Sequence, residues 1–240
     1  MEISLITLVT IVAGAVGTLT GFGTSTIMVP VLLLFLPLSQ TLLLVGVIHF
    51  FGNIWKILLF KKGLNWKLIF TFGAAGIVLS YLGSSLVFAA PEVLLSRILG
   101  GFFLAYVIFL FLEPNFRIKG STLTALAGGG LSGFFAGIFG VGGAVRGAFL
   151  SAFDLPKAVY ISTAGAIALF IDATRITNYI LNEVTLENRL IWGFVLFIPA
   201  SFAGAAAAKK IVDRIPQNKF RIVIAVFLLL AGLRLLIFPR

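Results

Sequence analysis

Apolar stretches separated by short polar breaks run along the whole chain. Most of them hold about 20 residues, enough for an α-helix to cross the hydrocarbon layer of a membrane. The breaks carry proline, glycine or charged residues, as in Lys61-Lys62-Gly63 and Glu113-Pro114-Asn115, and such residues end helices. The stretches cover residues 4–20, 26–37, 39–60, 67–89, 92–112, 122–138, 144–153, 157–181, 190–208 and 218–238. This pattern predicts an all-α polytopic membrane protein.

Two of the breaks are glycine clusters rather than charged loops. The first is Gly21-Phe22-Gly23-Thr24-Ser25-Thr26, and the second is Gly140-Val141-Gly142-Gly143-Ala144-Val145-Arg146-Gly147. Glycine inside a helix costs about 0.5–1 kcal/mol relative to alanine. A membrane tolerates the freed backbone groups only where protein or a water-filled cavity satisfies them. Each cluster therefore predicts a discontinuous or re-entrant first helix, which three transmembrane helices follow.

An internal repeat relates the two clusters at an offset of 119 residues, as from Gly21 to Gly140. Glycines alone could match by chance, but proline and polar residues of similar type match in the same register. The matched pairs are Gly14 with Gly133, Gly21 with Gly140, Gly23 with Gly142, Pro37 with Pro156, Asn53 with Asp172, Lys56 with Arg175 and Ile57 with Ile176. We therefore expect two homologous repeats, residues 1–118 and 119–240.

Composition excludes a soluble domain, and the location of the basic residues argues against a nucleic-acid partner. Hydrophobic residues fill 60% of the 240 positions, charged residues fill 11%, and the mean hydropathy is +1.15. A soluble chain of this size could not bury so much apolar surface. The net charge is +10, but most Lys and Arg lie in short loops between apolar stretches, as cytoplasmic loops do. We expect a lipid bilayer and no nucleic acid as partner.

The distribution of loop charge bears on how the two repeats are oriented. If each broken region crosses the membrane once, the repeats are parallel and the loop Lys and Arg divide 8 to 7 between the two sides. If each is a re-entrant hairpin, the repeats are inverted and the division is 11 to 4. The eleven are Lys61, Lys62, Lys67, Arg117, Lys119, Lys157, Lys209, Lys210, Arg214, Lys219 and Arg221. The positive-inside rule favours inverted repeats with both termini outside the cytoplasm.

The residues expected to carry function lie at the glycine clusters and in the long helices after them. The N-terminal end of a half-helix projects N–H groups and a positive dipole end, which bind anions. The predicted substrate-binding residues are Gly21, Gly23, Thr24, Ser25, Gly140, Gly142, Gly143 and Arg146. Five polar residues inside apolar stretches are predicted to act in gating or coupling: His49, Asn53, Lys56, Asp172 and Arg175. Asp172 is the expected proton carrier among them.

Each of these residues also has a purely structural interpretation. Glycines at helical spacing, such as Gly133 and Gly137, pack membrane helices closely. Arg146 could reach an interface or pair with Asp172, and Asp172 could form an ion pair with Arg175 along its own helix. Lys56 could extend to the interface, and a lone histidine such as His49 is usually a hydrogen-bonded packing residue. These alternatives stay open at this point.

The sequence contains no pattern that points to catalysis or to a cofactor. It shows no metal-ligand cluster, no serine with a nearby His and acid, and no phosphate-binding loop. Cysteine is absent, so disulfides and thiolate chemistry are excluded. We expect that the protein is not an enzyme, and that it has no metal and no cofactor.

The two glycine motifs resemble those of the TauE/SafE family, the sulfite exporter or toluene sulfonate uptake permease family. They read Gly14-Ala-Val-Gly-Thr-Leu-Thr-Gly-Phe-Gly-Thr and Gly133-Phe-Phe-Ala-Gly-Ile-Phe-Gly-Val-Gly-Gly-Ala, and a Leu-Pro pair follows each, at 36–37 and 155–156. The resemblance covers essentially the whole chain. The chain differs from the usual family pattern in its second half, where Phe149 replaces a proline and Arg146 replaces an apolar residue.

The resemblance implies a transporter of small sulfur-containing anions in the inner (cytoplasmic) membrane of a prokaryotic cell. Together with the residues above, it predicts a permease or exporter for a small anion, such as a sulfur oxyanion like sulfite or an organosulfonate. Protons are the candidate coupling ion, and a homo-oligomer is compatible with the sequence. Two alternatives stay open: an anion channel that uses the same site, and a membrane scaffold or sensor that transports nothing.

Overall fold

The structure is a computed structural model that describes residues 2–20, 23–112, 118–211 and 217–239. Within these ranges it is entirely helical, with ten α-helices, one short 3-10 turn at Ser151–Phe153 and no strand. The helices are α1 (Glu2–Thr20), α2 (Ser25–Leu32), α3 (Leu38–Leu59), α4 (Trp66–Ala89), α5 (Glu92–Leu112), α6 (Thr122–Phe139), α7 (Gly142–Leu150), α8 (Lys157–Leu181), α9 (Asn188–Ile211) and α10 (Gln217–Ile237).

Seven of the described helices, namely α1, α3, α4, α5, α6, α8 and α9, are long and apolar enough to cross a membrane. Large apolar side chains cover their outer surface, as Trp192, Leu123 and Phe70 do with exposed fractions of 77%, 76% and 67%. Several charged and hydroxyl side chains lie inside instead, among them those of Lys56, Asp172 and Ser132. This distribution suits lipid as the surrounding solvent, and it confirms the prediction of an all-α polytopic membrane protein.

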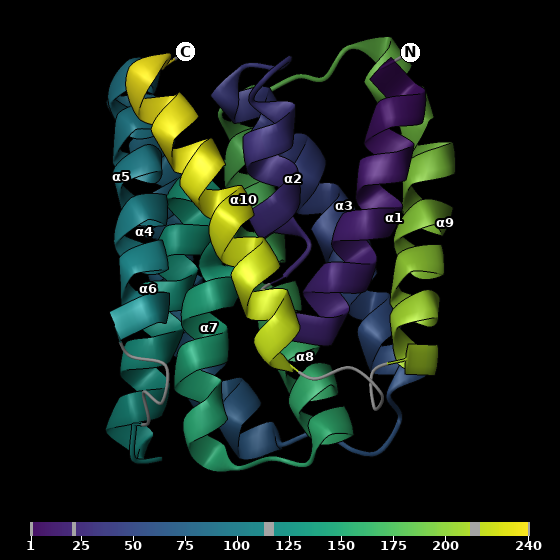
Figure 1. The fold of residues 1–240 in the computed structure, drawn as a ribbon, viewed down its shortest axis with the longest axis vertical. Coiled ribbons are helices and arrows are strands. Elements are labelled where there is room, and N and C mark those ends of the chain that lie inside the picture. Colours follow the sequence, from purple (N-terminus) through teal and green to yellow (C-terminus); the bar gives the residue numbers. More distant parts are fainter. Residues whose placement is uncertain (1, 21–22, 113–117, 212–216, 240) are drawn as a thin grey trace.

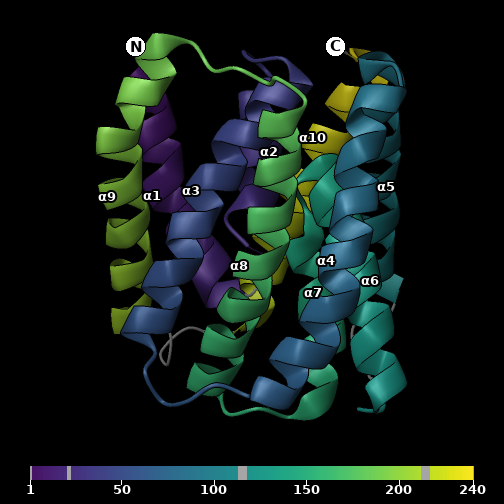
Figure 2. The same cartoon turned by 180° about the vertical axis from the view of Figure 1, so that it is seen from behind.

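The long helices run along one common direction, and both chain ends lie at the same end of the molecule (Figures 1 and 2). Central α3 and α8 have α1 and α9 on one side and α4, α5 and α6 on the other. The short helix α2 lies in the half nearer the chain ends, and α7 lies in the opposite half (Figure 1). Each long central helix therefore lies near one of the short helices.

Small residues let the helices at the two sides approach closely. A Cβ added to Gly133 would overlap the carbonyl oxygen of Gly76, and one added to Gly137 would overlap that of Ser80. These contacts join α6 to α4, and Gly204 of α9 meets the backbone of α1 at Ile11 in the same manner. The structural interpretation of Gly133 and Gly137 thus agrees with their surroundings, because backbones in membrane helices approach only where side chains are small.

Helix α2 ends earlier than the apolar stretch 26–37 suggests, because its last helical residue is Leu32. The amide of Leu34 then bonds the carbonyl oxygen of Val31 at 3.2 Å, which is a tighter turn than the α-helix. The chain afterwards reaches Pro37, where α3 begins. Every residue between the helix end and this proline is apolar, so hydropathy carried no sign of the helix end.

Candidate functional site

The starts of α2 and α7 lie next to each other inside the molecule, although 119 residues separate the two glycine clusters. A Cβ built on Gly23 would lie 3.6 Å from the Cα of Gly143, 3.7 Å from Ser25 Oγ and 3.2 Å from His49 Nε2. Four residues that the sequence singled out separately therefore line one place. Gly21 lies outside the described residues.

Two glycines in these connections adopt backbone conformations that other residues rarely take. Gly23 has φ +82°, and Gly140 has φ +71° where it follows the end of α6. The Gly140 amide bonds Ala136 O at 2.9 Å and the next amide bonds Phe135 O at 3.3 Å, so the last carbonyls of α6 are satisfied. Gly142 has a different reason to lack a side chain, because its Cβ would overlap the carbonyl oxygen of Ser132.

The N-terminal ends of α2 and α7 are buried and lack side-chain caps. The residues before them, Thr24 and Val141, accept no hydrogen bond from the first turn with their side chains. Thr24, Ser25 and Thr26 are each 1% exposed, so the start of α2 is shielded from solvent. The first N–H groups of a helix have no partner within the helix and give its start a partial positive charge. Two such ends converge here.

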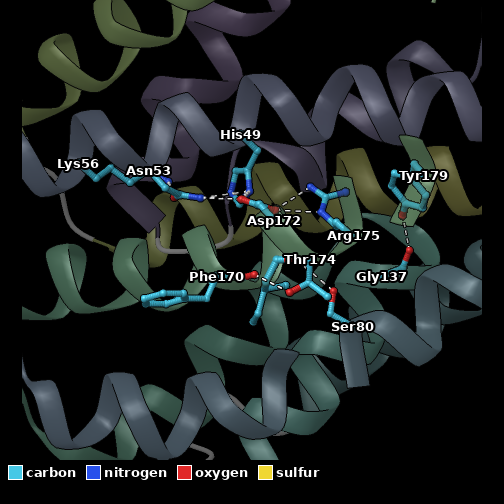
Figure 3. A network of polar contacts seen from close by, with 11 residues as sticks. His49, Asn53, Lys56, Ser80, Gly137, Phe170, Asp172, Thr174, Arg175 and Tyr179 are labelled. Carbon is cyan, nitrogen blue, oxygen red and sulfur yellow. Dashed lines mark hydrogen bonds and ion pairs between the residues drawn. The ribbon is translucent and has the colours of Figure 1, made fainter. Parts of the chain in front are cut away.

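A polar network joins α3 to α8 beside these helix ends (Figure 3). Asp172 lies at its centre. Its Oδ2 accepts from His49 Nδ1 at 2.8 Å and from Asn53 Nδ2 at 3.0 Å, while its Oδ1 accepts from Arg175 Nε at 2.9 Å. Lys56 Nζ donates to Asn53 Oδ1 at 3.1 Å. All five residues predicted to act in gating or coupling thus form one connected group.

Positive charge exceeds negative charge in this region. Lys56, Arg146 and Arg175 are buried, with exposed fractions of 6%, 4% and 0%, and Asp172 is the single buried carboxylate among the described residues. Arg175 Nη2 also lies 2.9 Å from Asp172 Oδ1, which is an ion pair, while the hydrogen bond to that oxygen comes from Nε. Three cations against one anion make a costly arrangement away from water.

Five buried polar atoms here have no hydrogen-bond partner within the described part of the chain. They are Ser25 Oγ, His49 Nε2, Arg146 Nε, Arg175 Nη1 and Arg175 Nη2. An unsatisfied buried polar group costs about 1–3 kcal/mol, and more when it is charged. Such groups are rare, and several in one place indicate a binding site. All five belong to residues predicted to bind substrate or to act in coupling.

Arg146 and Lys56 do not extend to the surface, since both are almost fully buried. The intrahelical ion pair between Asp172 and Arg175 is present, and Asp172 receives His49 and Asn53 from α3 in addition. No group of three or more His, Cys, Asp or Glu side chains suited to a metal ion occurs in the described ranges. The arrangement can therefore hold an anion, through helix ends, a hydroxyl and guanidinium groups.

The chain matches a known family of membrane proteins. The family profile described as "Sulfite exporter TauE/SafE" matches residues 6–235, nearly the whole chain. The chain belongs to the TauE/SafE family. Neither the curated proteins nor the solved structures contain a significant match to it. TauE/SafE is a family of membrane transporters of the sulfite exporter type. This match and the seven apolar helices together show that the chain is a multi-pass membrane protein of a family that transports small molecules.

Sequence reasoning missed several polar residues of this TauE/SafE protein that continue the network along α8. Asn178 Nδ2 donates to Ser84 Oγ at 2.7 Å. The Tyr179 hydroxyl donates to the carbonyl oxygen of Gly137 (Figure 3). Both are buried, at 4% and 0% exposure. Their spacing of three and four residues after Arg175 is a helical periodicity that could have revealed them.

Proposed function

We propose that this TauE/SafE protein is a secondary transporter of a small oxyanion, a sulfur oxyanion or organosulfonate such as sulfite, in the inner membrane of the cell. The observation that carries the proposal is the set of five unpartnered buried polar atoms at the converging starts of α2 and α7. They lie in a region with three buried cations and one buried carboxylate. An anion bound there offers acceptors to the unpartnered hydroxyl and guanidinium groups and reduces the excess of positive charge.

The proposed anion lies between the two helix ends. The first N–H groups of α2 and α7 point at its oxygens, and Ser25 adds a hydroxyl donor. Arg146 lies in the second turn of α7, and its guanidinium adds donors in a planar fork that suits an oxyanion. Arg175 contributes the two Nη groups that Asp172 leaves without hydrogen bonds. Catalysis has no role in this mechanism.

The proposal includes two inverted repeats, and the pattern of helix contacts supports it. Exchanging α1–α5 with α6–α10 turns the α1–α9 contact into α6–α4, and the α3–α9 contact into α8–α4. The α3–α8, α5–α10 and α2–α7 contacts map onto themselves. The positions of α2 and α7 in opposite halves of the molecule (Figure 1) support opposite senses for the two repeats. Transporters built in this way expose a midplane site to each side alternately.

Burial favours a transporter over an open channel. The charged residues of the site are at most 6% exposed, and the residues at the two helix starts that carry substrate-binding predictions are buried as well. A conducting pore would leave such groups in contact with water on both sides. The site is occluded instead, as expected for one intermediate of an alternating-access cycle.

Uptake into proteoliposomes tests the proposal. We expect radiolabelled sulfite or thiosulfate to enter vesicles with saturable kinetics, and each unlabelled anion to compete with the other. Arg146→Gln removes the buried cation and should abolish this uptake, whereas Arg189→Gln changes an exposed arginine on the surface and should retain it. Linear, non-saturable flux would instead identify a channel, and absence of any flux or binding would contradict the proposal.

A further inference from the structure

We propose that His49 is the proton-binding residue of the transport cycle, so that one proton joins its Nε2 for each anion that binds. Asp172 stays ionised and acts as a positioning residue. The inference rests on the proposed anion site and assigns its coupling to a residue other than the carboxylate that the sequence suggested. It follows from the hydrogen bonds of the imidazole and from the place that its second nitrogen faces.

The partners of His49 determine which nitrogen carries the proton in the neutral ring. Lys56 Nζ is a pure donor, so the Asn53 atom that it contacts is the carbonyl oxygen, and the Asn53 amide nitrogen faces Asp172. His49 Nδ1 lies 2.8 Å from Asp172 Oδ2. An ionised carboxylate only accepts, so Nδ1 must carry the hydrogen. The contact from Asn53 Nδ2 to His49 Nδ1, at 3.3 Å, is then not a hydrogen bond.

The other nitrogen of His49 faces the anion site. Nε2 is buried, has no partner in the described part of the chain, and lies 3.2 Å from the Cβ position of Gly23. The start of α7 at Gly143 and the hydroxyl of Ser25 border the same position. With Nδ1 protonated, Nε2 offers a lone pair to an arriving oxygen and repels it. After Nε2 takes up a proton it becomes a donor, so anion and proton stabilise each other.

Asp172 is poorly suited to take up the proton itself. Its Oδ1 accepts from Arg175, and its Oδ2 accepts from both His49 and Asn53. A proton on either oxygen would place an O–H donor against an N–H donor that now bonds to that oxygen, so an existing hydrogen bond would be lost. A carboxylate held by several donors keeps its charge. Its effect is therefore to fix the tautomer and the orientation of the imidazole.

The charges around His49 couple its protonation to the anion. Asp172 contacts it from α8 and pairs with Arg175 on the same helix, while Arg146 of α7 and Lys56 of its own helix interact with it electrostatically. Ser25 of α2 borders the same position beside Gly23 as His49 Nε2. Helix α2 carries no titratable residue, and those of the adjacent α1 and α9 are Glu2, Arg189, Lys209 and Lys210 at the helix ends. A proton on His49 adds a positive charge to three cations and one carboxylate. A bound anion offsets that charge, and by linkage the proton strengthens anion binding equally.

Nitrogen NMR of the histidine tests the inference without any substitution. The chain contains a single histidine, so protein labelled with 15N-histidine and purified with a histidine-free tag gives one imidazole. Without anion, we expect Nδ1 protonated and Nε2 bare at neutral pH. Saturation with methanesulfonate or thiosulfate, anions of strong acids that bring no proton, should protonate both nitrogens. An Nε2–H tautomer in the free protein, or an unchanged ring after saturation, would overturn the inference.

Calorimetry counts the proton and separates the two proposals. Titration of the same anions in imidazole and in Bis-Tris, which are amine buffers and not sulfonates, should give close to one proton taken up per anion. Affinity should fall about tenfold for each pH unit where the proton is linked. His49→Gln should still bind anion, but without proton uptake and without this pH dependence. Binding with no proton uptake in the unsubstituted protein overturns the role of His49 alone, and no binding of any tested anion overturns the anion site as well.

Discussion

Arg146 should affect stability and anion binding in opposite directions. Its side chain is 4% exposed, and Nε has no partner in the described part of the chain. Replacing it with methionine, an unbranched apolar side chain that adapts to irregular space, removes a buried charge together with the unsatisfied Nε. Removal of such a group should stabilise the anion-free protein by about 1–3 kcal/mol, which corresponds to about 2–12 °C in Tm for a chain of this length.

The same substitution should weaken binding. A hydrogen bond to a charged group contributes about 1.5–3 kcal/mol, so loss of the guanidinium should raise the Kd for thiosulfate about 10- to 150-fold. Thermal unfolding with and without thiosulfate, in detergent at fixed ionic strength, measures both effects on one sample. Arg189→Met is the control, since that exposed arginine forms surface ion pairs with Glu2 and Glu187 that contribute about 0–1 kcal/mol. A lower Tm without anion, together with unchanged affinity, would show that Arg146 is structural.

Three further predictions address the backbone and the topology. Gly23→Ala should lose transport and about 1–3 kcal/mol of stability, because φ is +82° and the new Cβ would lie 3.2 Å from His49 Nε2. Gly101→Ala, with open space around it, should be neutral in the same uptake and unfolding assays, and equal behaviour of the two variants would refute the strain argument. Gly133→Ala should separate α6 from α4 and lower the yield of folded protein on size-exclusion chromatography, while Gly73→Ala, also in open space, should not; an unchanged yield would contradict the close contact. A reporter fused after Arg240 should be active outside the cytoplasm, and cytoplasmic activity would rule out the proposed orientation.

Helix positions followed from the sequence at two stretches with clear ends, whereas α9 continues through Lys209 and Lys210 to Ile211. The stretches 92–112 and 157–181 correspond residue for residue to α5 and α8, because proline or charge flanks both. The apolar stretch 26–37 does not show where α2 ends, since the chain leaves the helix at Leu32 within an apolar run. Hydropathy reports transfer from water and cannot show a turn that forms among apolar residues.

The sequence singled out the polar residues that the structure brings together, but it did not show their contacts. Helical spacing placed Asn53 with Lys56 and Asp172 with Arg175 on single helix faces. It could not show that α3 and α8 lie against each other, so the contact between His49 and Asp172 across 123 positions had no local signal. The sequence favoured Asp172 as the proton carrier, but in the folded protein both oxygens of this carboxylate accept hydrogen bonds from neighbouring side chains.

The contact between His49 and Asp172 also bears on how the two halves have diverged. In the register of the repeat, His49 corresponds to Ala168, and Asp172 corresponds to Asn53. A symmetric assembly of two N-terminal halves would set histidine against asparagine, and an assembly of two C-terminal halves would set alanine against aspartate. Neither contains the acid–imidazole pair. Under the proposed duplication, the two copies have become specialised with complementary contributions, and a dimer of either present-day half would lack the acid–imidazole pair to which we assign proton binding.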